Sequence, residues 1–172
     1  MKQTSFFKSS EKAYGGSLLT KRKARSHGRP LATRSTMHLV LRSTQAKGEW
    51  SFIRHAKTVK NILEKFARKY GIKLISVANV GNHLHLHIQL GNRYTYAPFI
   101  RAITGSIALK IKGRTTKKLK FWDRRPFTRI VIGRWAYLGM QDDIKINQLE
   151  GETGSRIHAE LIVRGPRWAE TG

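Results

Sequence analysis

The stretch NHLHLHIQL, residues 82–90, alternates polar and apolar side chains with a period of two. This period is that of a β-strand with one apolar face, so the stretch predicts a strand over residues 83–90 with its leucines and isoleucine in the core. The other face carries three histidines in succession, His83, His85 and His87. One histidine there would be an ordinary exposed side chain, but three of the seven in the chain favour a role as ligands.

The segments around this strand predict a small α+β domain. Residues 72–80 predict a second strand, which joins the histidine strand through a tight turn at Gly81 as an antiparallel hairpin. Apolar periodicity predicts two more strands and three helices, at residues 37–42, 127–132, 55–70, 96–111 and 134–149. The order β-α-β-β-α-β-α predicts a ferredoxin-like (RRM-like) antiparallel sheet with an additional C-terminal helix.

The two ends of the chain differ in composition from this domain. Residues 1–36 carry nine Lys and Arg and one acid, with no apolar period, and predict a basic N-terminal arm before a domain at residues 37–150. Residues 151–172 predict a C-terminal extension, which is either irregular or contains a short strand at residues 157–163.

The charge of the chain indicates a polyanionic partner. Lys and Arg number 34 against 10 Asp and Glu, which gives a net charge of +24. Nucleic acid offsets such an excess most readily, and no apolar run or basic amphipathic helix favours a membrane instead. The chain has no cysteine, which excludes disulfides and cysteine-based zinc sites and fits a cytoplasmic, nucleoid-associated protein.

A second motif lies in the helix predicted at residues 134–149, where Tyr137 and Gln141 are four residues apart and therefore share one helical face. The combination of NHLH at residues 82–85 with this Tyr-xxx-Gln helix resembles the single-tyrosine HUH transposases, in which HUH denotes His-hydrophobic-His. The Arg-Pro pair at residues 29–30, just before the first predicted strand, is similar to that of the REP-associated tyrosine transposases. The resemblance covers roughly residues 30–150.

The resemblance implies an enzyme that nicks single-stranded DNA and transfers the strand, at hairpin or repetitive palindromic elements, as a monomer or a homodimer. It implies that His83, His85 and Gln141 hold a divalent metal, Mg²⁺ or Mn²⁺, and that Tyr137 attacks the phosphodiester. The products are a 5′-phosphotyrosine link and a free 3′-hydroxyl, and the reversal of this step on another strand needs no ATP. A bound cation polarises the phosphate and lowers the cost of deprotonating a tyrosine, so these residue types suit the chemistry.

Some assignments within this site stay open. The metal pair is His83/His85 if Asn82 marks the start of the motif, and the alternative pair is His85/His87. In the first case His87 supports the ligands, contacts the DNA or has no role in the site. Asn82 supports the ligands or is itself an alternative ligand. Two tyrosines that follow the histidine strand are alternative nucleophiles by proximity, Tyr94 and Tyr96.

Basic side chains are expected to contact the phosphates of the DNA. They lie in the arm and in a second basic block, and they are Arg22, Lys23, Arg25, Arg29, Arg34, Arg124 and Arg125. Phe121 and Trp122 precede the last two, and they are either core residues or a platform on which unpaired bases stack.

Two other functions are compatible with the sequence. A non-catalytic nucleic-acid-binding module, RRM-like or ribosome-associated, needs only the β-α-β-β-α-β order and the positive charge. An RRM, however, carries stacking aromatics on its central strands, where this chain carries histidines. A zinc hydrolase that uses the three histidines would need a general base, and no Glu lies close to them in the sequence.

Overall fold

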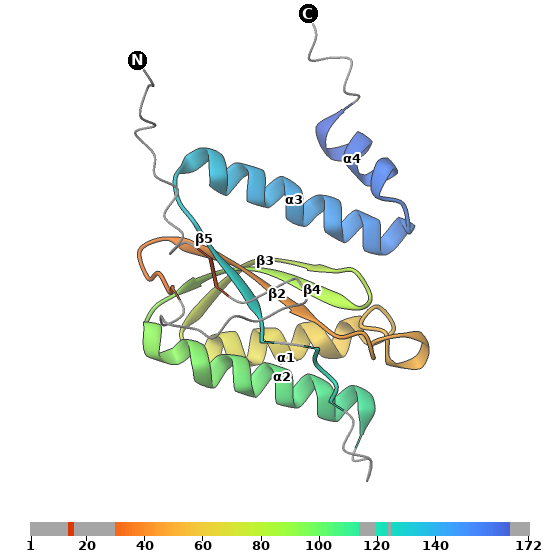
Figure 1. Cartoon of the computed structure of the whole chain (residues 1–172), viewed down its shortest axis with the longest axis horizontal. Coiled ribbons are helices and arrows are strands. Elements are labelled where there is room, and N and C mark those ends of the chain that lie inside the picture. Colours follow the sequence, from red (N-terminus) through yellow and green to blue (C-terminus); the bar gives the residue numbers. More distant parts are fainter. Residues whose placement is uncertain (1–13, 16–29, 114–119, 124, 166–172) are drawn as a thin grey trace, which may run out of the picture.

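The computed structural model describes residues 14–15, 30–113, 120–123 and 125–165. Within them, five strands form one sheet in the order β1-β5-β2-β4-β3, with every neighbouring pair antiparallel (Figure 1). The strands are β1 (Tyr14–Gly15), β2 (Thr36–Arg42), β3 (Ile72–Asn79), β4 (His83–Leu90) and β5 (Phe127–Val131). The histidine strand β4 therefore lies inside the sheet, between β2 and β3.

Helices cover both faces of this sheet. Figure 1 shows α1 and α2 on one face and α3 across the other, with α4 beside α3. The helices are α1 (Ala56–Lys69), α2 (Tyr96–Lys112), α3 (Arg134–Thr153) and α4 (Arg156–Arg164), with short 3-10 turns η2 (Gly48–Trp50) and η3 (Arg93–Thr95). No helix in the described part of the chain has the length and apolarity needed to cross a membrane.

The main core lies between the sheet and the helices α1 and α2. Leu84, Leu86 and Ile88 of β4 are fully buried there against β2 residues such as Leu39. Helix α2 contributes its buried face, which consists of Tyr96, Phe99, Ile103, Ile107 and Ile111. The period of two in β4 thus places its apolar residues in the core and its histidines on the face under α3.

A smaller apolar cluster holds α3 on the opposite face, and consists of Ala78, Val131, Met140 and Ile144. The C-terminal half of α3 comes very close to the end of β3. A Cβ at Gly151 would lie 2.1 Å from the carbonyl oxygen of Asn79, and the backbone N–H of Asn79 donates to Gln148 Oε1 at 3.1 Å. Gly151 therefore permits this approach because it has no side chain.

The fold class predicted from the sequence is confirmed, and each strand and helix predicted between residues 37 and 149 is present. Two residues of the predicted arm, Tyr14 and Gly15, pair with β5. Both alternatives for residues 157–163, a short strand or an irregular extension, are wrong, because this segment is part of α4. Ser155 caps that helix by accepting a hydrogen bond from the backbone N–H of His158, and Arg156 pairs with Glu160 one turn later at 3.0 Å.

Candidate active site

The face of the sheet under α3 carries four histidines, three from β4 and one from β2. His38 of β2 lies opposite His87 in the β2–β4 pairing, and Val40 lies opposite His85. The sequence motif does not include His38, because this residue lies in another predicted strand, at residues 37–42. The signal was present, since His38 stands between Met37 and Leu39, which are both fully buried on the other face.

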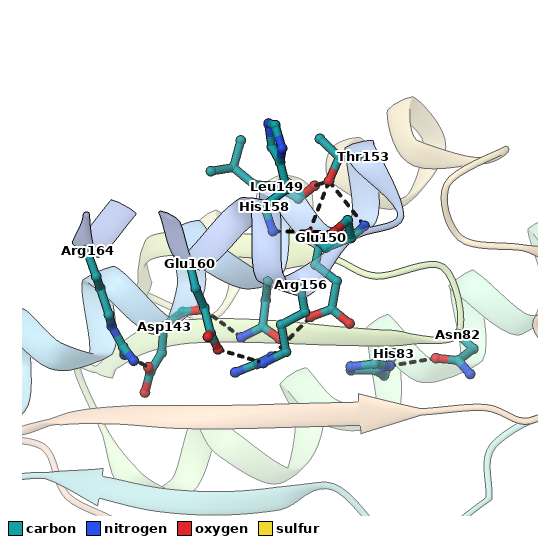
Figure 2. Close-up of polar contacts among 12 residues, drawn as sticks. Asn82, His83, Asp143, Leu149, Glu150, Thr153, Arg156, His158, Glu160 and Arg164 are labelled. Atoms are coloured by element: carbon teal, nitrogen blue, oxygen red, sulfur yellow. Dashed lines mark hydrogen bonds and ion pairs between the residues drawn. The ribbon is translucent and has the colours of Figure 1, made fainter. Parts of the chain in front are cut away.

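The turn between β3 and β4 fixes His83. Gly81 has a φ of +88°, a conformation that other residues rarely adopt, and the backbone N–H of Val80 donates to the carbonyl of His83 at 3.1 Å. The next residue, Asn82, has its Oδ1 2.6 Å from His83 Nδ1 (Figure 2). An amide oxygen can only accept, so His83 carries its proton on Nδ1, and the lone pair of the neutral ring is on Nε2.

His85 is joined to His38. Its Nδ1 lies 3.0 Å from His38 Nε2, and the two rings are nearly parallel, with their centroids 5.2 Å apart. Its other nitrogen, Nε2, is buried and has no hydrogen-bond partner among the described residues. Buried polar atoms are rarely left in this state, so this atom is available to a ligand.

His87 uses both of its nitrogens. The amide nitrogen of Gln141 lies 3.1 Å from His87 Nδ1, and Thr36 Oγ1 lies 2.7 Å from His87 Nε2. An amide nitrogen can only donate, so His87 accepts at Nδ1 and donates from Nε2 to the threonine hydroxyl. His87 is therefore bound to protein at both positions where a metal would attach.

Burial keeps all four histidines neutral. Desolvation, followed by the electrostatic effects of His38, His83 and Arg156, lowers the pKa of His85 to about 3. Desolvation and then Arg129 and His87 lower the pKa of His38 to about 4. Desolvation also lowers the pKa of His87. Desolvation and the charge of Arg42 lower the pKa of His83, and the charge of Glu150 opposes them. Neutral imidazoles keep their lone pairs at neutral pH, as metal ligands must.

The structure brings Tyr137 and Gln141 to His87 and describes no contact of either with His83 or His85. The ring centroids of Tyr137 and His87 are 5.0 Å apart, and the side chain of Tyr137 is 37% exposed. Tyr137 and Gln141 do share one face of α3, as the sequence predicts. Their contact with His87 depends on how α3 lies across the sheet, which the local sequence does not specify.

The residues present can supply part of a metal site. Within the described ranges, no group of three or more His, Cys, Asp and Glu side chains is arranged to hold a metal ion. His83 and His85 could nevertheless each supply one ligand through Nε2, and their rings are 4.9 Å apart between centroids. Other ligands would have to be the amide of Gln141, water or a phosphate oxygen.

A pair of acidic residues and an arginine lie near this histidine pair. Arg156 of α4 contacts Glu150 and Glu160, both at 3.0 Å. Figure 2 shows these three side chains between the helices and the strands, on the same face of the sheet as His83. The charges of Glu150 and Arg156 act on His83 and His85, respectively. No pattern in the sequence singles out Arg156, because its nearness to β4 depends on the packing of α4 against α3.

The aromatic residues that the sequence offered as a base platform or as alternative nucleophiles lie outside this site. Phe121 is 5% exposed, and Trp122 stacks on Phe52 and donates its indole N–H to the carbonyl of Thr104, so both aromatics are core residues and not a platform for bases. Tyr96 is part of the same core, and Tyr94 lies in η3, ahead of the helix α2 that covers the opposite face.

Two of the predicted DNA-contacting residues lie within the described ranges, and both Arg34 and Arg125 are exposed. The others lie outside the described residues, and they are Arg22, Lys23, Arg25, Arg29 and Arg124. The contact of all seven with DNA stays a prediction.

Comparison with known proteins finds one sequence family that matches this chain and solved structures that are similar to it. The family described as "Transposase IS200 like" matches residues 32–131, a range that ends before Tyr137. The structure of a REP-associated tyrosine transposase bound to a REP hairpin is similar, with a TM-score of 0.61 and 14% identity over 74% of each chain. A crystal structure of a candidate transposase from Deinococcus radiodurans gives a TM-score of 0.44 and 17% identity, over 74% of this chain and 98% of that one. No curated protein matches the sequence.

Proposed function

Because the chain belongs to the IS200-like transposase family, we propose that it cuts and rejoins single-stranded DNA with Tyr137 as nucleophile and a divalent metal on His83 and His85. The observation that carries this proposal is the state of the two Nε2 atoms. His83 is held by Asn82 so that its Nε2 lone pair is free, and the Nε2 of His85 is buried without a partner. Two such nitrogens, two residues apart on one strand face, suit one cation.

The contacts of His87 favour His83/His85 over His85/His87 as the metal pair, because Gln141 and Thr36 occupy both nitrogens of His87. Mg²⁺ or Mn²⁺, when bound, would polarise the scissile phosphate and neutralise charge that develops on its oxygens. Gln141 is the third ligand that the family resemblance implies. It is held by His87 in this structure, so it would reach a metal only by giving up that hydrogen bond.

Tyr137 would supply the nucleophile. Its phenol loses a proton, a bond forms between its oxygen and the phosphorus, and the bond from phosphorus to the 3′ oxygen breaks as that oxygen gains a proton. The step replaces one phosphodiester by another, so the 3′-hydroxyl of a different strand can reverse it and complete the transfer. Since His85 and His87 are two residues apart on β4, about 6.6 Å along the strand, DNA that lies along this face would reach both the histidine pair and Tyr137.

The charge of the chain favours DNA as the partner. The net charge of +24 attracts the phosphate backbone. The similar REP-associated transposase was solved with a REP hairpin. A single-stranded oligonucleotide that carries a hairpin is therefore the first substrate to try.

The experiment incubates the protein with such oligonucleotides in Mn²⁺ or Mg²⁺ and follows the label in a denaturing gel. A 5′-phosphotyrosine link joins the protein to the downstream fragment, so a 3′ label should move to the protein and a 5′ label should appear on a shorter free strand. Tyr137→Phe and EDTA should each abolish both products, whereas Tyr94→Phe, the matched change at an exposed tyrosine outside the site, should leave them.

Each contrary outcome has a distinct meaning. Tight binding without an adduct in either metal would contradict catalysis and leave a nucleic-acid-binding module. An adduct that survives Tyr137→Phe would assign the nucleophile to another residue. An adduct that survives EDTA would contradict the metal requirement.

A further inference from the structure

We propose that His38 is a positioning residue for the metal site, which accepts a hydrogen bond from the Nδ1–H of His85 and thereby leaves the Nε2 lone pair of His85 for the metal. The inference rests on the proposed function, since it assumes that His85 is a ligand. Nothing in the sequence motif includes His38, which lies on another strand 47 residues before His85.

The contact between the two histidines is fixed from several sides. Strands β2 and β4 pair in register, with Val40 opposite His85 and His38 opposite His87, so His38 and His85 lie diagonally across one strand pair. Their rings are nearly parallel, with 14° between the planes, and the edge of Phe127 from β5 contacts His38 at 6.4 Å between centroids. The side chain of His38 is therefore held in place by the sheet and does not depend on a flexible loop.

The hydrogen bond between the two rings admits two proton positions. If His38 donates, His85 must carry its own proton on Nε2, where a buried N–H would have no acceptor among the described residues. If His85 donates from Nδ1, its Nε2 is a lone pair that a cation can satisfy. The second position is the one compatible with a metal, and ligating histidines commonly donate their other ring N–H to an acceptor in this way.

The neighbouring ligand shows the same arrangement with a different acceptor. Asn82 Oδ1 accepts a hydrogen bond from the Nδ1–H of His83, which leaves Nε2 free. His38 Nε2 would do for His85 what Asn82 does for His83, and both ligands would then present the same ring nitrogen. His87 has the opposite arrangement, because it accepts at Nδ1 from Gln141.

The first test reads the proton position directly in metal-free protein. In a chain with ¹⁵N-labelled histidine, the two-bond ¹⁵N–¹H correlations of His85 should show the proton on Nδ1 in the unaltered protein and in His38→Gln, whose amide oxygen can also accept. In His38→Phe, which keeps a flat ring but offers no acceptor, the proton should move to Nε2. A proton on Nε2 in the unaltered protein, or no change in His38→Phe, would overturn the inference.

The second test measures Mn²⁺ affinity by titration calorimetry or by the EPR signal of free Mn²⁺. His38→Phe should bind Mn²⁺ about 10- to 100-fold more weakly, the range found when a group that orients a metal ligand is removed. His38→Gln should restore most of the affinity. His158→Phe is the matched control, because His158 is exposed on α4 and points away from the strands in Figure 2.

The two tests separate the inference from the proposed function. If the unaltered chain binds no Mn²⁺, the metal site of the proposed function is contradicted. The proton position of His85 in the metal-free protein still decides whether His38 orients the His85 ring. If the unaltered chain binds Mn²⁺ and His38→Phe binds it equally well, His38 is only a packing residue and the inference fails.

Discussion

The two faces of the sheet are built from the same strands and differ in what holds them together. On the face covered by α1 and α2, leucines and isoleucines pack into a continuous apolar core. On the face covered by α3, the apolar cluster has only four buried residues, and histidines occupy the space beside it. Their nitrogens bond to one another, to Asn82, to Thr36 and to Gln141.

This difference indicates a division between stability and chemistry within single strands. Along β4, side chains that stabilise the core alternate with side chains that face α3 and the proposed ligand site. Substitutions at adjacent positions should therefore have opposite consequences, and the following predictions test that contrast.

The largest effect is expected at His85. His85→Ala removes one of the two proposed ligands, and the rate of formation of the covalent DNA adduct should fall on the order of 10³-fold or more, as for other groups essential to a catalytic site. The free energy of unfolding, measured by urea denaturation, should change by about 1 kcal/mol. An adduct rate within tenfold of the unaltered protein would contradict the assignment of His85.

The adjacent residue should show the reverse. Leu86 is fully buried, so Leu86→Ala leaves a cavity in the main core and should lower the free energy of unfolding by about 2–5 kcal/mol. At a temperature where the variant is still folded, its adduct rate should match that of the unaltered protein. A large loss of rate with little loss of stability would mean that the two faces are not separate in function.

A smaller effect is expected where α3 meets the sheet. Gly151→Ala places a Cβ 2.1 Å from the carbonyl oxygen of Asn79, so α3 must shift away from β3. The expected loss is about 1–3 kcal/mol, as for other overpacked sites, with faster amide exchange in α3 than in α1 or α2. Gly139→Ala is the control in the same helix, because a Cβ there meets no atom within 4 Å. Equal stability of the two variants would contradict the close approach of α3 to β3.

The last prediction concerns pH, whose effect on the free energy of unfolding is spread over several pH units. The folded pKa values of His38 and His85 are about 4 and about 3, below the ordinary value of 6.5 expected in the unfolded chain. At pH values between the folded and unfolded pKa values, the unfolded chain binds more protons than the folded protein. The free energy of unfolding should therefore fall as the pH drops below 6.5. The slope should be up to about 1.4 kcal/mol per pH unit for each histidine, and neither should contribute above that pH. Urea denaturation from pH 8 to pH 5 measures this slope, which His38→Phe should reduce. A slope unaffected by that change would place the titrating group elsewhere.

The sequence predicted those parts of the molecule that depend on local patterns. Strand β4 begins and ends at the predicted residues, because its alternation is strict and turn residues flank it. Helix α4 was missed because Ile157, Ile162 and Val163 are β-branched and suggest a strand, while the cap at Ser155 and the Arg156–Glu160 pair that favour a helix are weaker signals.

The parts of the site that depend on packing between distant segments could not be predicted. The motif gave Tyr137, Gln141 and the histidines of β4, but the contact of Gln141 with His87 follows from the position of α3 over the sheet. His38 belongs to the site only because β2 pairs with β4 in one particular register. A slip of one residue would turn His38 to the other face.

The most direct test of the histidine pair is pulsed EPR on Mn²⁺ bound to the protein, which counts the imidazole nitrogens that coordinate the ion. The unaltered chain should show two coordinated imidazoles, His83→Ala and His85→Ala should each show one, and His87→Ala should still show two. A Mn²⁺ spectrum without imidazole coupling, or the loss of a coupling in His87→Ala, would contradict the assignment of the metal to His83 and His85.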